Sequence, residues 1–221
     1  METRTTGMFK SLGVKIMRTL ISILLVLIIS YSCSNDKKLE TDKIIKKVYN
    51  ESDIVFLKKI LVFFDSEICK LSDKTDLYDC YQDYFDFKMK QINIGEFTIR
   101  IPFDKQLELF NSFDSTFIFE NWGYGRMHER KEDKYYEYLN LRNDGKFSKF
   151  LELLSSENKK FRYYSETLNS AGCITPSMIG GLIINAKEYD IKDEKVRLVF
   201  AIHYLTLNDE NKSRREVNGF K

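Results

Sequence analysis

The sequence is poor in the residues that interrupt regular structure. Its 221 residues include only 2 prolines and 10 glycines. Proline breaks a helix interior and glycine weakens it, so their scarcity argues against a chain built from many tight turns. Lysine, glutamate and leucine, which favour helix, are plentiful. The composition therefore predicts a mainly α fold, an irregular helical bundle with one or two short strands.

The chain also lacks an excess of charge of either sign. It has 35 basic and 33 acidic residues, which give a formal net charge of +2 at pH 7. Binding to a phosphate backbone depends on a clustered excess of Lys and Arg, so the balance gives no electrostatic case for nucleic acid as a partner. Hydrophobic residues make up 43% of the chain, which excludes an intrinsically disordered protein and indicates one folded domain.

No apolar run is long enough to cross a membrane. The longest, "LISILLVLII" (Leu20–Ile29), has roughly ten residues, whereas a membrane-spanning helix needs about 20. Lys15 and Arg18 precede it. A short apolar core behind a positive flank is typical of a secretory signal peptide. We therefore expect a signal peptide over residues 1–32, and the compact leader that begins at Met17 indicates Met17 as the true start.

The residues that follow resemble the cleavage box of bacterial lipoproteins. In "ISYSC", aliphatic Ile29 and small Ser32 precede Cys33, although Tyr31 stands where the box usually has Ser, Ala, Thr or Val. Such relaxed boxes are similar to those of Bacteroidetes-like lipoproteins. The resemblance implies cleavage before Cys33, a lipid on its thiol, and a body anchored to the outer membrane of the cell envelope, in the periplasm or on the surface. An uncleaved signal anchor is the alternative.

Beyond Cys33 we expect a polar tether over 33–42, a single helical domain over 43–208 and a polar, frayed tail over 209–221. Apolar residues at three- and four-residue spacing indicate the helices, and alternation indicates strands. Helices are expected over about 39–70 with a break near 50–53, 77–89, 103–113, 146–156 and 158–170, from Pro176 with Thr175 as its N-cap, and over a last apolar helix that closes near Asn208. Strands are expected at Phe97–Ile101 and, as a strand or extended loop, at Ser115–Gly125.

Four cysteines are present, and acylation of Cys33 would leave three. Cys69 and Cys80 flank an apparent helix–turn–helix, so they lie close enough in sequence to form a disulfide in an oxidising envelope. Cys173 is then the odd one, and a buried core thiol is the simplest interpretation. No CxxC motif occurs, so neither a zinc ribbon nor a thioredoxin-type site is indicated. We expect no metal and no cofactor.

No catalytic motif appears either. HExxH, GxSxG and the glycine-rich phosphate loops are absent from the sequence. His128 lies in a charged segment and His203 on an apolar helix, where a core role is the simpler interpretation. Acidic residues are numerous, and no pair of them is singled out. We therefore assign no catalytic residue and expect a protein that is not an enzyme.

Aromatic residues are the most unusual feature, with 17 Phe and 13 Tyr but one Trp. Most should fill a helical core. For a ligand surface we favour Trp122, Tyr124 and Arg126, because a lone Trp beside glycines and Arg resembles an exposed binding anchor. The sequence thus predicts a lipid-anchored envelope protein that binds a protein or glycan. The alternatives are an envelope hydrolase using acidic residues and an immunity-type protective lipoprotein.

Overall fold

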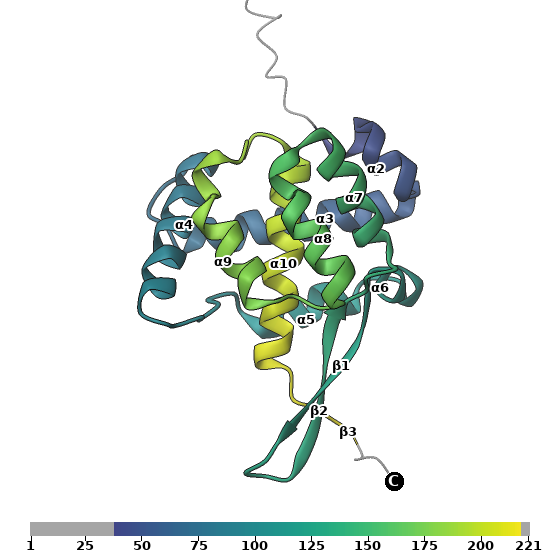
Figure 1. Ribbon diagram of the computed structural model, residues 1–221, viewed down its shortest axis with the longest axis vertical. Helices are drawn as coiled ribbons and strands as arrows, with labels where there is room; N and C mark the ends of the chain where they lie inside the picture. The colour runs from purple at the N-terminus through teal and green to yellow at the C-terminus, as the bar shows by residue number, and fades with distance from the viewer. Residues whose placement is uncertain (1–37, 218–221) are drawn as a thin grey trace, which may run out of the picture. The chain divides into compact units, whose positions relative to one another are not determined.

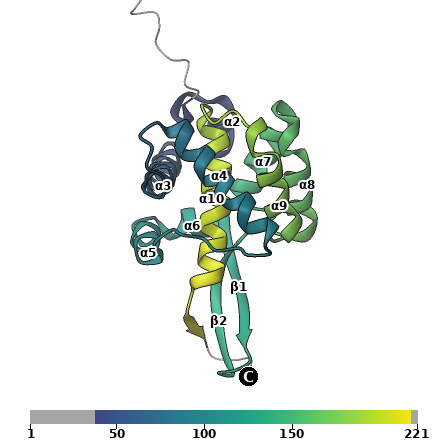
Figure 2. The ribbon, with the colours of Figure 1, turned by 90° about the vertical axis from the view of Figure 1, so that its left-hand side faces the viewer.

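A helix near the C-terminus, α10 (Glu194–Lys212), lies at the centre of the fold (Figures 1 and 2). All of its residues from Glu194 to Asp209 are buried. It contacts α3 and α5 as well as strand β2 of a small sheet. The computed structural model describes residues 38–217. Because α10 is covered on every side, it is the core element around which the other helices of this region pack.

Shorter amphipathic helices surround α10, and the mainly α prediction is confirmed. Single-turn 3₁₀ helices at Leu39–Thr41, Lys159–Phe161 and Ala186–Glu188 join some of them. The surrounding helices are α2 (Lys43–Val48), α3 (Glu51–Lys70), α4 (Leu77–Asn93), α5 (Phe103–Asn111), α6 (Ser115–Asn121), α7 (Lys146–Glu157), α8 (Arg162–Ala171) and α9 (Pro176–Ile184).

Local side chains fix where several helices begin. Asn50 caps α3 through a reciprocal capping box with Asp53, at the expected break near 50–53. Asp76 caps α4 by accepting from the backbone N–H groups of Tyr78 and Asp79. Thr175 caps α9 with Pro176 as its first residue, as expected.

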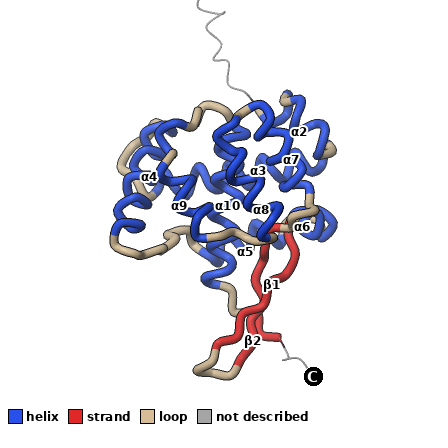
Figure 3. The backbone as a smooth tube through the Cα atoms, in the orientation of Figure 1, coloured by secondary structure: helices blue, strands red, loops and turns tan. Residues whose placement is uncertain are grey.

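Three antiparallel strands form the sheet, in the order β1-β2-β3. They are β1 (Trp122–Glu129), β2 (Lys134–Leu141) and β3 (Arg215–Val217). Strands β1 and β2 form a hairpin that projects from the helices (Figure 3). The segment Ser115–Gly125, expected as extended, is therefore helical up to Asn121 and becomes a strand only at Trp122.

The segment Phe97–Ile101 is not a strand, so that expectation is wrong. Its alternation is real, because Ile99 and Ile101 are buried while Phe97 is exposed. Its backbone, however, has no partner strand. The ammonium of Lys212 instead donates to the carbonyls of Ile99 and Ile101, at 2.9 and 2.8 Å. Side chains of α10 thus supply the hydrogen bonds that a neighbouring strand would have supplied.

Both ends of the folded body extend further than expected. Leu39 is fully buried and its N–H donates to Glu194, so the body begins inside the expected tether 33–42. Asp209 is also fully buried, α10 continues to Lys212, and β3 pairs with β2, so a frayed tail from residue 209 is wrong for residues 209–217. The expected signal peptide, the start at Met17 and the lipidated Cys33 lie outside the described residues.

Two cysteines join the end of α3 to the beginning of α4. The sulfurs of Cys69 and Cys80 form a disulfide, with the two Cα atoms 4.9 Å apart. Cys173 is exposed just beyond Gly172, whose positive φ ends α8, so the expected core thiol is wrong. Among residues 38–217, no helix is both long and apolar enough to cross a membrane.

Candidate functional site: an aromatic cleft at the base of the hairpin

The three residues favoured as a binding surface share one face of β1. Trp122, Tyr124 and Arg126 alternate along the strand, so their side chains point to the same side of the sheet. Their directly opposite neighbours on β2 are Leu141, Leu139 and Glu137. The structure thus brings the three into one row, with Trp122 nearest the helices and Arg126 farthest along the hairpin.

Trp122 is not an exposed anchor, so this part of the prediction is wrong. Its side chain is fully buried. The ring packs against Phe110 and Phe117, with centroids 5.5 and 6.2 Å away. Its indole N–H donates to the hydroxyl of Thr206 at 2.8 Å. A large ring with its one polar atom satisfied inside the core is a structural group that fixes the base of the hairpin.

Tyr124, the next residue of the row, lies at an open cleft. Tyr124 is 51% exposed and Phe119 is 49% exposed, and their rings meet edge to face with 5.9 Å between centroids. We call this hollow the hairpin cleft; its volume is about 270 Å³. It is lined by residues from α5, from α6 and its preceding turn, and from all three strands. These residues are Leu107, Phe110, Asn111, Phe113, Ser115, Ile118, Phe119, Tyr124, Leu139 and Arg215.

Arg215 supplies the cationic group of the hairpin cleft. Its guanidinium lies 5.9 Å from the centroid of the Tyr124 ring and also pairs with Asp209. Burial raises the pKa of Asp209, although a hydrogen bond from the Leu139 N–H and the charge of Arg215 both act to lower it. The buried carboxylate holds Arg215 in place, while 37% of the Arg215 side chain stays accessible to a ligand.

Arg126 lies beyond the hairpin cleft on the same face. It pairs with Glu137, directly opposite on β2, with 3.0 Å between Nη2 and Oε1. Tyr124 and Arg126 are thus both accessible and adjacent, as a binding surface requires. Phe119 and Arg215 were missed. Phe119 belongs to the same aromatic cluster in the sequence, whereas Arg215 carries no local signal, because only the pairing of β3 with β2 brings it here.

The titratable groups most suited to catalysis lie elsewhere. His128 stacks on Tyr135 and makes a 2.9 Å contact with Asp133 near the hairpin tip. His203 is buried against Tyr164, and burial lowers its pKa to about 3, so it is neutral. None of the described residues that line the hairpin cleft is an acid, a histidine or a cysteine. Within residues 38–217, no cluster of three or more such side chains is placed to hold a metal ion.

Comparison of the chain with protein-family models, with curated proteins and with solved structures found no match. The geometry of the hairpin cleft and the character of the leader are therefore the basis for a functional proposal.

Proposed function

We propose that this protein is a non-enzymatic binding protein of the bacterial cell envelope, anchored to the outer membrane by a lipid on Cys33. Its hairpin cleft takes a segment of a partner polypeptide. One observation carries this proposal: two half-exposed aromatic rings and an accessible arginine line an open hollow beside a strand at the edge of its sheet. Exposed aromatic residues and arginine are the groups enriched at binding hot spots.

The sheet edge favours a polypeptide over a glycan. Strand β1 pairs with β2 on one side and is the edge strand of the described sheet. An edge strand can accept an extended peptide through main-chain hydrogen bonds, while pockets beside it take alternate side chains. The cleft of about 270 Å³ is smaller than a typical small-molecule pocket of roughly 300–1,000 Å³. It suits one or two side chains of a longer partner.

The leader and the position of the hairpin support the anchor. A short apolar run, a positive flank and a box resembling that of lipoproteins precede Cys33. The described chain begins next to α2, at the end of the helical body away from the hairpin (Figure 1). An anchor just before α2 would therefore leave the hairpin cleft free to meet a partner. If the protein is an immunity-type lipoprotein, the polypeptide bound in the hairpin cleft would be a toxin.

A photo-crosslinker at position 124 tests the cleft. The full-length protein carrying benzoyl-phenylalanine in place of Tyr124 should crosslink a defined polypeptide in envelopes of the source cells. The matched control replaces Tyr163, a tyrosine of α8 that is 55% exposed and does not line the cleft. The Arg215→Ala variant should lose the crosslink. A glycan ligand would give a different result. The native protein would then sediment with cell-wall polysaccharide, Tyr124→Ala would abolish this sedimentation, and no polypeptide would be crosslinked.

Detergent partitioning tests the anchor separately. The native chain should enter the detergent phase of Triton X-114, and Cys33→Ser should move it to the aqueous phase with the mass of the lipid lost. The matched control is Cys173→Ser, which removes the exposed thiol of Cys173 and leaves Cys33 in place. Unchanged partitioning and mass for Cys33→Ser would exclude a lipid on this residue.

A further inference from the structure

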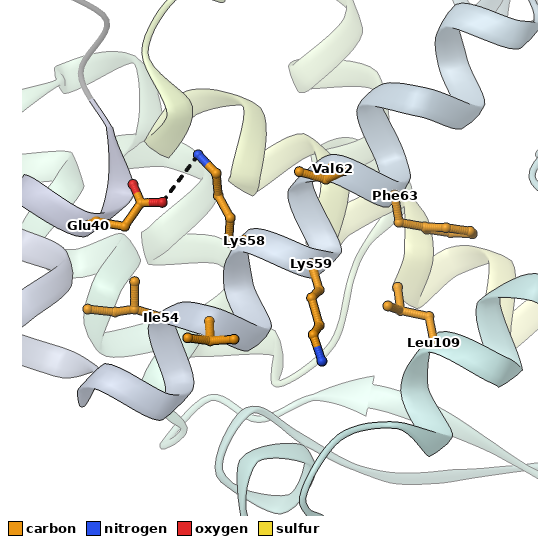
Figure 4. Close-up of a pocket in the computed structure, with 8 residues that line it drawn as sticks. Glu40, Ile54, Lys58, Lys59, Val62, Phe63 and Leu109 are labelled. Atoms are coloured by element: carbon orange, nitrogen blue, oxygen red, sulfur yellow. Dashed lines mark ion pairs between the residues drawn. The ribbon is translucent and has the colours of Figure 1, made fainter.

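A second hollow, larger than the hairpin cleft, runs along α3. It lies between the outer face of α3, Leu109 of α5 and Glu40 near the beginning of the described chain, and its volume is about 470 Å³ (Figure 4). We call it the α3 groove. Its walls are mainly the apolar side chains of Ile54, Val55, Val62, Phe63 and Leu109.

Two of the apolar residues that line the α3 groove are unusually accessible. Val55 is 54% exposed and Val62 is 57% exposed. They lie two helical turns apart and so belong to one stripe of α3, while the opposite side of the helix packs against α10. Contiguous exposed apolar surface of this kind commonly marks a binding site for a partner or a membrane.

Two lysines border this stripe, and they differ in their partners. The Lys58 ammonium is neutralised by Glu194 at 2.6 Å and Glu40 at 3.5 Å. The Lys59 ammonium lies 5.6 Å from the centroid of the Phe56 ring, and no carboxylate of residues 38–217 forms an ion pair with it. Among residues 38–217, Lys59 is therefore a lysine without an ion-pair partner at the border of the apolar trough. This combination complements an acyl chain that carries an anionic head group.

The length of chain before the groove restricts how far a lipid anchor could be from it. Glu40 follows Cys33 by only a few residues. Because an extended chain spans at most about 3.5 Å per residue, the chain from Cys33 to Glu40 can span no more than roughly 25 Å. A membrane that holds a lipid on Cys33 is thus within reach of the groove, and anionic lipids attract a surface lysine at this range.

We propose that the α3 groove seats one acyl chain of an anionic phospholipid from the membrane in which Cys33 is anchored, with Lys59 facing the head group. This inference rests on the proposed lipid anchor. It assigns a membrane-facing side to the body, which would then be docked on the bilayer instead of moving freely on its tether.

Tryptophan quenching tests the seat directly. The full lipidated chain with Val62→Trp, in vesicles of phosphatidylglycerol with brominated acyl chains, should lose much of its added emission, as expected for an indole buried in the acyl boundary. The matched control is Ile184→Trp on α9, which is 67% exposed and does not line the groove. Its emission should be unchanged. The native Trp122 is buried and gives the same background in both proteins.

Charge reversal tests the head-group contact. Lys59→Glu, added to Val62→Trp, should remove most of the quenching in phosphatidylglycerol and have little effect in phosphatidylcholine. Lys149→Glu, on α7, makes the same change of charge at another exposed lysine and should have no effect. Absent quenching, equal quenching at both reporters, or insensitivity to Lys59→Glu would overturn the proposal. Burial of the Val62→Trp indole without bromine quenching would indicate a protein partner or a second copy, and would overturn it too.

The two proposals fail in different ways. If the native chain enters the detergent phase but the Val62→Trp indole is not quenched, the proposed lipid on Cys33 is supported and the proposed binding of an acyl chain in the α3 groove is wrong. If the native chain carries no lipid and stays in the aqueous phase, the anchor itself is wrong, whatever the reporters show.

Discussion

The indole N–H of Trp122 donates to the hydroxyl of Thr206, which in turn donates to the carbonyl of Ile202. This pair joins the first residue of the hairpin to the central helix, two elements far apart in the sequence. Both side chains are buried, so neither polar atom has water as an alternative partner. The position of the hairpin cleft relative to the core depends on this contact.

Removing the Thr206 hydroxyl should therefore be costly. Thr206→Val keeps the shape of the side chain but leaves the buried indole N–H without an acceptor, which costs about 1–3 kcal/mol of unfolding free energy. Thr206→Ser keeps the oxygen and should cost about 1 kcal/mol or less. Urea unfolding of both variants measures the difference. Equal stability of the Val and Ser variants would contradict a structural role for the bond.

The disulfide predicts a second difference in stability. Cys69 and Cys80 close a short loop, with a sequence separation of 11. A loop of this size restricts the unfolded chain enough that replacing both cysteines by alanine should cost about 2–3 kcal/mol. Cys173→Ala removes the exposed thiol and should leave stability unchanged. Thermal unfolding of these variants without reductant measures both effects, and a double variant as stable as the native chain would contradict the prediction.

Local chemistry explains which parts of the fold could be predicted. Helix caps such as Asp76 and Thr175 act within three residues of themselves, and the stop at Gly172 depends on its own φ. The apolar spacing of α3 and α10 likewise reflects one helix at a time. These signals predict the mainly α class and the approximate position of most helices, because they depend only on residues close together in the sequence.

The rest depended on pairings between distant segments. Trp122 looks like an exposed anchor in its own sequence and is buried only because Thr206 and the rings of α5 and α6 surround it. Arg215 and Asp209 lie in a polar stretch that looks frayed until β3 pairs with β2. Of the candidate site, the sequence therefore indicated Tyr124 and Arg126, whereas Arg215 needed the tertiary structure.

A third prediction concerns Gly125 in the hairpin. A Cβ atom here would lie 2.4 Å from the ring of Tyr138, directly opposite on β2, so the ring packs on the bare glycine backbone. Gly125→Ala should displace the ring and cost about 1 kcal/mol. Gly123→Ala is the matched control on the same face, because its Cβ would meet Arg142 at an ordinary 3.6 Å. Urea unfolding compares them, and equal stabilities would contradict the packing argument.

The last prediction is an acid sensitivity caused by His203. Burial, helped by the nearby charge of Lys88, lowers the pKa of this histidine from 6.5 to about 3. The unfolded chain therefore binds a proton below about pH 6.5 that the folded chain does not bind until about pH 3. Stability is lost as pH falls through this window, at about 1.4 kcal/mol per pH unit.

His203→Asn isolates this effect, because Asn keeps a polar group near the Tyr164 hydroxyl, which lies 2.9 Å from Nδ1, and does not titrate. The native chain should lose about 3 kcal/mol more than the variant between pH 6.5 and pH 4. Urea unfolding of both proteins at several pH values measures it, and the comparison cancels the other titrating groups. Parallel stability curves for the two proteins would show that His203 takes up a proton in the folded core, which its burial and the charge of Lys88 both oppose.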